Sequence, residues 1–288
     1  VQAGVIPTSI NTAAAPFDLF FPPNPSTDNR CNLGGMVGNN SWGSNAPIYG
    51  DTSDYLDEVE LILADATIIK FSDVTQQQLE QIYLEKSRET ELYKSVINHV
   101  IQQRKQIQSY PWYTQAIPNN MGYRLHKLLN RVTDPQSLGP PFNMSQLICG
   151  SEGTLGLITE ITVSLEKRPA HKNLMCAHFN SLFDALNAVP LILSQSTVTI
   201  ELLDKNLIDL ASENSKLKDD NFWINSTAHA ILLIECLGDD ANQTRAFATA
   251  LKTSLKLLAF ICLQMIKHPT LGEYENQLWE CYSALQRV

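Results

Sequence analysis

Residues 31–50 read CNLGGMVGNNSWGSNAPIYG, and residues 150–156 read GSEGTLG. These two short stretches hold eight of the thirteen glycines of the chain. Glycine lets the backbone adopt positive φ and approach a ligand closely, with amide groups directed at that ligand. Although residues 51–149 separate the two stretches, we predict that both are loops and that they converge in space on one large, extended cofactor.

The composition predicts a soluble globular protein with one large domain or two ordinary ones. The chain has 288 residues, of which 44% are hydrophobic, so it can bury a substantial core. A formal net charge of −9 and the lack of a basic stripe argue against a nucleic-acid partner. The apolar run at 255–265 is too short to span a bilayer and is interpreted as a buried helix, so no transmembrane segment is expected.

The cysteine and histidine patterns argue against a metal site. The six cysteines include no C-x-x-C pair, which excludes a zinc ribbon or an iron–sulfur ligand run. Scattered reduced thiols are typical of a cytoplasmic protein, with peripheral membrane association left open. The six histidines show no H-x-H or H-x-x-x-H spacing, so we expect them to be structural or surface residues.

The first part of the chain is predicted to be rich in β-structure with a helical insertion. Residues 1–5 are predicted to form a strand that leads into a short helix, and the missing initiator methionine indicates a fragment. Residues 58–71 predict two strands around a turn at Asp65–Ala66, where alanine would cost about 1 kcal/mol in the positive-φ conformation. Helical spacing of apolar residues from 75 to about 108 predicts a helical excursion, which extends to about 130.

The second part of the chain predicts an α+β layer of the ferredoxin-like kind. The alternating residues 157–165 predict a strand, and Arg168-Pro169-Ala170-His171 marks a candidate domain boundary. After it the pattern predicts strands at 174–179, 197–203 and 230–236 and helices at 182–193 and 242–257. This β-α-β, β-α order is typical of a sheet covered by helices.

Neither standard nucleotide-binding loop fits the glycines. A Rossmann fold requires G-x-G-x-x-G between a strand and a helix, whereas the first stretch has G-G-x-x-G and is followed by Asn, Ser, Pro and Tyr, which argue against a helix. A P-loop requires G-x-x-x-x-G-K-[ST], and no lysine follows either stretch.

The two glycine stretches and their flanks carry a family resemblance. Residues 22–67 (PPNPSTDNRCNLGGMVGNNSWGSNAPIYGDTSDYLDEVELILADAT) resemble the second half of the FAD-binding domain of the FAD-linked oxidase superfamily, the fold of vanillyl-alcohol oxidase and p-cresol methylhydroxylase. Residues 142–165 resemble the segment that closes that domain, and 171–279 more weakly resemble the start of the family's C-terminal cap domain. D-lactate dehydrogenases and the FAD subunit of glycolate oxidase are the relatives that this pattern suggests.

The resemblance implies an α+β fold with two domains. Residues 1–168 would form an FAD-binding domain of the p-cresol methylhydroxylase type, truncated at its N-terminus, with a helical excursion at about 75–130. Residues 169–288 would form an incomplete, ferredoxin-like cap domain. The implied FAD contacts are Pro25, Ser26, Thr27, Gly34, Gly35, Gly38, Asn39, Asn40, Ser41, Gly43, Tyr49, Gly50, Glu152, Gly153, Gly156 and Ile158. Those of the first stretch would follow the flavin and diphosphate with their backbone amides as donors, and those of the second would lie against the nucleotide half.

The implied activity is the oxidation of a 2-hydroxy acid, such as D-lactate or glycolate, by hydride transfer to flavin, with electrons passing to a quinone, a cytochrome or an iron–sulfur protein. The family's first diphosphate loop and its histidine-rich motif are not in this sequence, so no catalytic residue is assigned and the fragment alone is expected to be inactive. Trp42 stands where relatives usually carry a small residue or cysteine, and Tyr282 where they often carry arginine. A cofactor-poor scaffold subunit and an FAD oxidase of another alcohol therefore remain alternative hypotheses.

Overall fold

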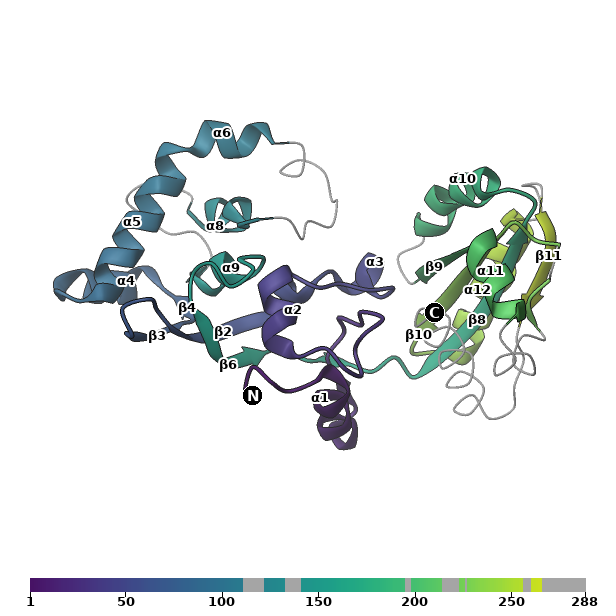
Figure 1. The fold of residues 1–288 in the computed structure, drawn as a ribbon. Coiled ribbons are helices and arrows are strands. Elements are labelled where there is room, and N and C mark those ends of the chain that lie inside the picture. The colour runs from purple at the N-terminus through teal and green to yellow at the C-terminus, as the bar shows by residue number, and fades with distance from the viewer. Residues whose placement is uncertain are drawn as a thin grey trace. The chain divides into compact units, whose positions relative to one another are not determined.

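The computed structural model describes residues 1–110, 122–132, 141–194, 198–213, 223–225, 227–255 and 260–265 (Figure 1). Contacts between Cα atoms divide the chain into two compact units, which consist of Val1–Gly43 with Tyr49–Lys167 and of Ser44–Ile48 with Arg168–Val288. Each unit is built around its own main sheet, and buried apolar residues form one core in the first unit and two in the second. Tyr282 lies outside the described residues.

The centre of the first unit is a three-stranded antiparallel sheet in the order β3-β2-β6. Its strands are β2 (Leu56–Ile62), β3 (Ile68–Phe71) and β6 (Leu157–Val163). Alternate side chains of β2 face the core, where Val59 and Leu61 are fully buried. The turn between β2 and β3 confirms the prediction for Ala66, which has a φ of 64°.

The predicted helical excursion is confirmed. It consists of α4 (Gln76–Leu84), α5 (Arg88–Gln102), α6 (Arg104–Ser109) and α8 (Leu125–Arg131). Thr75 and Gln78 form a capping box at the start of α4, and the Ser87 side chain caps α5. Helix α5 buries one face of its surface in the core, with Tyr93, Ile97 and Val100 among the buried residues.

Two predictions for this unit are wrong. Residues Leu33–Asn39 form helix α2, so Gly34, Gly35 and Gly38 lie in a helix rather than a loop and have no positive φ. Residues 1–5 do not form a strand, and their ladder is reduced to an isolated bridge from Gln2 to Glu160. The same segment caps α2 instead, and these long-range contacts outweigh the low helix propensity of glycine.

Short elements complete the first half of the chain. They are α1 (Pro7–Ala14), η1 (Ala15–Phe17), β1 (Leu19–Phe20), α3 (Ala46–Tyr49), η2 (Thr52–Tyr55), β4 (Asp73–Val74), β5 (Phe142–Asn143), α9 (Ser145–Ile148) and β7 (Glu166–Lys167). Strand β1 pairs with β7 and β4 with β5, both antiparallel. These pairs tie residues that are far apart in the sequence into one unit.

The second unit has the predicted ferredoxin-like arrangement, with an antiparallel sheet in the order β11-β8-β10-β9. Its elements are β8 (His171–Phe179), α10 (Leu182–Leu193), β9 (Val198–Asp204), α11 (Lys205–Glu213), β10 (Ala230–Gly238), α12 (Ala241–Leu255) and β11 (Phe260–Met265). Residues of α10 and α12 share one core with the sheet, and Ile208 of α11 and Trp223 belong to a second core with it.

The buried helix predicted for 255–265 is wrong. Helix α12 ends at Leu255, and Phe260–Met265 form strand β11, which pairs with β8. A short apolar run is compatible with a helix or a buried strand, and here the free edge of the sheet decides between them. Within the described ranges, no helix has both the length and the apolar composition needed to cross a membrane. The cytoplasmic location stays a prediction.

Candidate functional site

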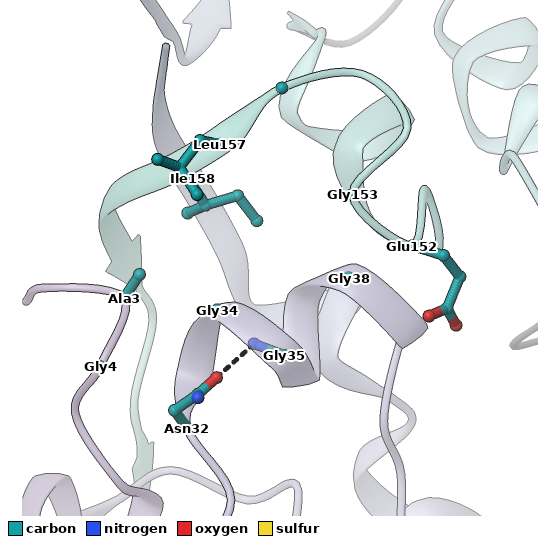
Figure 2. Close-up of a pocket in the computed structure, with 11 residues that line it drawn as sticks. Ala3, Gly4, Asn32, Gly34, Gly35, Gly38, Glu152, Gly153, Leu157 and Ile158 are labelled. Carbon is teal, nitrogen blue, oxygen red and sulfur yellow. Dashed lines mark hydrogen bonds between the residues drawn. The ribbon is translucent and has the colours of Figure 1, made fainter.

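The first unit contains a cavity of about 370 Å³ that is bounded by three segments of the chain (Figure 2). One wall comes from the N-terminal segment, a second from the start and body of α2, and a third from residues 152–158. Its lining residues are Ala3, Gly4, Asn32, Gly34, Gly35, Gly38, Glu152, Gly153, Gly156, Leu157 and Ile158. The volume lies within the range of small-molecule sites in proteins.

The N-terminal wall is held by backbone hydrogen bonds to α2. The amide of Leu33 donates to the carbonyl oxygen of Val5, and the amide of Gly34 donates to that of Ala3, both at 2.8 Å. The amide of Gly35 donates to Oδ1 of the N-cap residue Asn32 at 2.7 Å. The chain itself therefore accepts the hydrogen bonds of the Gly34 and Gly35 amides, and their role as diphosphate donors stays a prediction.

The third wall is joined to α2 by two further backbone bonds. The Gly150 amide donates to the Val37 carbonyl at 2.9 Å, and the Glu152 amide donates to the Gly38 carbonyl at 2.8 Å. Gly150 and Gly153 have positive φ values of 85° and 76°, as expected for a glycine-rich turn. The structure thus brings the two glycine stretches together.

Five of the six glycines that line the cavity fall into two groups. A Cβ atom added to Gly4, Gly38 or Gly153 would meet no heavy atom within 4 Å. A Cβ atom on Gly34 would lie 2.9 Å from the Cβ of Ala3, and one on Gly156 would lie 2.9 Å from the carbonyl oxygen of Ile62. The first group therefore leaves bare backbone facing open space, whereas the second is needed for packing of the protein against itself.

Glu152 has an unusual backbone for its residue type. Its φ is 51°, a conformation that costs a non-glycine residue about 1–2 kcal/mol. Among the described residues that line the cavity, it is also the only ionisable one. Figure 2 shows its carboxylate at the end of the third wall. Strain of this kind is often found where a side chain must be held at a ligand site.

The structure does not place all of the predicted contact residues at the cavity. Those that line it are Gly34, Gly35, Gly38, Glu152, Gly153, Gly156 and Ile158. Those that do not are Pro25, Ser26, Thr27, Asn39, Asn40, Ser41, Gly43, Tyr49 and Gly50.

Several of the residues away from the cavity have structural reasons for their identity. A Cβ on Gly43 would lie 2.0 Å from the carbonyl oxygen of Asn24, so only glycine fits there. Tyr49 packs edge-on against Phe20, with ring centroids 5.4 Å apart. Gly50 has a φ of 78°, which glycine adopts without strain.

Four further residues line the cavity that the sequence did not predict, which are Ala3, Gly4, Asn32 and Leu157. Asn32 could have been found, because asparagine is a preferred N-cap residue and its side chain caps α2 here. Nothing in the sequence places Ala3 and Gly4 beside α2, since that contact depends on hydrogen bonds across about thirty residues.

Two titratable side chains of the first unit, those of Cys149 and His126, are held in their uncharged forms by burial. Burial raises the pKa of the Cys149 thiol well above its usual value, so the thiol stays protonated and is a weak nucleophile. Burial also lowers the pKa of His126 to about 4, and the positive charges of Arg124 and Lys127 act in the same direction. At neutral pH both side chains are therefore uncharged.

Known proteins match both parts of the chain. Residues 1–72 match the family "FAD binding domain", and residues 168–280 match the family "FAD linked oxidases, C-terminal domain". The D-2-hydroxyglutarate dehydrogenase of Pantoea ananatis is 27% identical over 90% of this chain, which spans 25% of that protein. Glycolate oxidase subunit GlcD of Bacillus subtilis is 25% identical over 82% of this chain, which spans 37% of that subunit.

A solved structure of alkyldihydroxyacetonephosphate synthase shares the fold. It superposes with a TM-score of 0.57 over 96% of this chain and 42% of that one, at 15% sequence identity. At that identity the likeness concerns the fold alone. This chain thus corresponds to less than half the length of each of these proteins.

Proposed function

The chain belongs to the FAD-linked oxidases, and from that premise we propose that it is part of an enzyme that uses FAD to oxidise a 2-hydroxy acid. The names of the relatives, D-2-hydroxyglutarate dehydrogenase and glycolate oxidase subunit GlcD, support a hydroxy acid as the substrate. The observation that carries the proposal is the convergence of three bare glycine backbones, from Gly4, Gly38 and Gly153, on one cavity.

The residues of the cavity fit part of an FAD molecule. Bare backbone at these three positions allows close approach of a flat ring or a ribose. Because the first amides of α2 already have partners within the chain, the cavity offers its ligand little of the positive potential that a helix start provides. The Glu152 carboxylate adds negative charge, which disfavours a phosphate. We therefore assign the cavity to the uncharged nucleoside part of FAD rather than to its diphosphate.

The role of this chain's own residues at the cavity is to bind and orient. Glu152 would accept hydrogen bonds from the hydroxyl or amino groups of the nucleoside, and Ile158 would contact its apolar surface. When bound, FAD supplies the acceptor for the hydride that leaves the substrate carbon. The remaining predicted contact residues, the 2-hydroxy acid and the electron acceptor (a quinone, a cytochrome or an iron–sulfur protein) stay predictions.

The proposal is tested by cofactor titration followed by substrate screening. Addition of FAD to the purified protein should quench flavin fluorescence, and adenosine should compete with FAD whereas inorganic diphosphate should not. The longer protein of which this chain is a part, loaded with FAD, should then lose its visible flavin absorbance under anaerobic conditions when a 2-hydroxy acid is added. D-2-hydroxyglutarate, D-lactate and glycolate are the substrates to compare, with L-lactate as the control.

Each alternative hypothesis has its own outcome in this experiment. A protein that binds no FAD would be a scaffold subunit, and the proposal would fail. A flavin that is bleached only by an alcohol without a carboxylate would assign the protein to a different group of FAD oxidases. Competition by diphosphate but not by adenosine would show that the assignment of the cavity to the nucleoside is wrong.

A further inference from the structure

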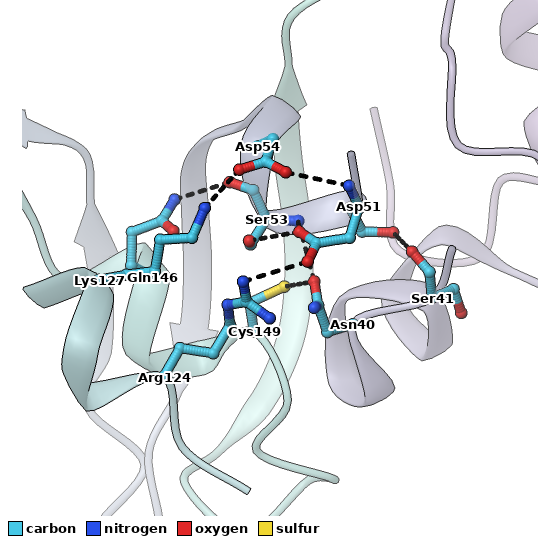
Figure 3. Close-up of polar contacts among 10 residues, drawn as sticks. Asn40, Ser41, Asp51, Ser53, Asp54, Arg124, Lys127, Gln146 and Cys149 are labelled. Carbon is cyan, nitrogen blue, oxygen red and sulfur yellow. Dashed lines mark hydrogen bonds and ion pairs between the residues drawn. The ribbon is translucent and has the colours of Figure 1, made fainter. Parts of the chain in front are cut away.

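A buried network of polar side chains joins the helical excursion to the residues that follow the first glycine stretch and precede the second (Figure 3). At its centre Nη2 of Arg124 lies 3.1 Å from Oδ2 of Asp51, and their side chains are only 4% and 9% exposed. Arg124 immediately precedes α8 in the helical excursion, whereas Asp51 caps η2 just after the first glycine stretch. Breaking a buried ion pair leaves an uncompensated charge, so this contact strongly constrains both segments.

The network continues from Asp51 to the walls of the cavity. Oδ1 of Asp51 accepts hydrogen bonds from the amide and the hydroxyl of Ser53 at 3.1 and 2.6 Å. The Ser53 amide also donates to Oδ1 of Asn40 at 3.0 Å, and the Cys149 thiol donates to the same oxygen at 3.1 Å. Asn40 is fully buried and has a φ of 52°. It therefore occupies a position that few residues other than glycine adopt.

Asn40 lies where the two glycine stretches meet. Its amide caps the end of α2, two residues beyond Gly38. Cys149 immediately precedes Gly150, whose amide bonds to α2, and Glu152 follows with the second such bond. The side chain of Asn40 thus joins the end of one cavity wall to the base of the other.

The helical excursion reaches the third wall at two more points. The Tyr123 hydroxyl lies 2.9 Å from Oγ1 of Thr154. A Cβ atom on Gly150 would lie 2.7 Å from the carbonyl oxygen of Gly122, so these backbones are in close contact. Residues 122–124 therefore touch the loop of Glu152 and Gly153 on one side and Asp51 on the other.

From these contacts we propose that Arg124 and Asp51 are positioning residues, which set the separation of the two glycine walls through Ser53 and Asn40. Neither residue lines the cavity. The names of the relatives assign no role to the helical excursion. In this proposal the excursion controls the geometry of the cavity. The functional meaning of that control rests on the proposed cofactor site, but the positional claim does not.

A double variant distinguishes the proposed positioning role of Arg124 and Asp51 from a role in stability alone. Arg124→Met and Asp51→Asn each leave one buried charge without its counter-ion and should lower the melting temperature. Combining the two removes both charges, so the melting temperature should recover. If the ion pair serves only stability, the cavity should recover with it.

The readout is amide hydrogen exchange at Gly150 and Glu152, whose hydrogen bonds join the two walls. We expect exchange at these two amides to be about tenfold faster in the double variant than in the wild type, while amides of β2 and β3 keep their wild-type rates. Arg88→Met is the matched control, since Arg88 and its partner Asp65 are both 49% exposed in their side chains. It should change neither the melting temperature nor the exchange.

Wild-type exchange at Gly150 and Glu152 in a double variant of restored melting temperature would overturn the proposal. So would faster exchange throughout the β2–β3 hairpin, because that result indicates general loosening. FAD affinity is measured in parallel and should fall with the change in exchange. A wild-type protein that binds no FAD would refute the proposed function and leave the exchange result to decide the positional claim.

Discussion

Replacing Gly38 with alanine should stabilise the protein and weaken cofactor binding at the same time. Gly38 is a buried residue of α2 with no positive φ, so alanine fits its backbone. The new Cβ would meet no heavy atom within 4 Å apart from the backbone of its own helix. Since Gly38 lines the cavity, the methyl group would enter the space that we assign to FAD.

The two effects have different sizes and opposite signs. Alanine in place of glycine within a helix gains about 0.5–1 kcal/mol. That gain would raise the melting temperature by about 1–4 °C for a unit of this size. A methyl group in a filled site costs about 1–3 kcal/mol of binding energy. At 1.4 kcal/mol per factor of ten, FAD should bind about 5- to 150-fold more weakly.

Differential scanning fluorimetry and FAD titration of the same preparation measure both effects. Gly34→Ala in the same helix is the matched control, because its Cβ would lie 2.9 Å from the Cβ of Ala3 and 3.2 Å from its carbonyl oxygen. This control should lower the melting temperature. If Gly38→Ala binds FAD as tightly as the wild type, or melts at a lower temperature, the reasoning about the open face of α2 is refuted.

Three further predictions follow from local geometry. Ala66→Gly should raise the free energy of unfolding by up to about 1 kcal/mol in urea titrations, because Ala66 has a φ of 64°; a loss of stability would contradict the strain. Gly43→Ala should lower the free energy of unfolding by about 2–3 kcal/mol, since its Cβ would lie 2.0 Å from the carbonyl oxygen of Asn24. An unchanged free energy of unfolding would show that the backbone around Gly43 shifts to accommodate the methyl group. Because burial lowers the pKa of His126 to about 4, the unfolded chain binds a proton below pH 6.5 that the folded chain does not. Stability should therefore be fully present above pH 6.5 and fall by up to about 3 kcal/mol toward pH 4. His126→Asn should flatten that pH dependence, and an unchanged slope would assign it to other groups.

The sequence predicted the regular elements well where one periodicity dominates a segment. Helix α10 has the predicted bounds, and the strands on either side of Asp65–Ala66 form the hairpin that alternation and turn chemistry indicate. The prediction for 255–265 was wrong because a short apolar run does not distinguish helix from strand. Strand β11 exists because the edge of β8 was available for pairing.

The candidate site was predictable only in part, for a related reason. The glycines predicted that another group approaches the backbone closely. Local sequence does not say whether that group belongs to a ligand or to the protein. Gly43 and Gly156 contact the carbonyl groups of Asn24 and Ile62, whereas Gly38 faces open space. All three look alike in the sequence.

By itself, then, the sequence determined the family, the two-part α+β organisation and the convergence of the two glycine stretches, whose contact with one cofactor stays a prediction. Only the tertiary structure decided that α2 is a helix, that the N-terminal segment accepts its first hydrogen bonds, and that residues 3–4 form a wall of the cavity. The physical reason is the separation along the sequence over which each effect acts. Propensity and periodicity act within about one turn or one strand, whereas these contacts join residues that are about thirty to more than one hundred positions apart and depend on how the whole unit packs.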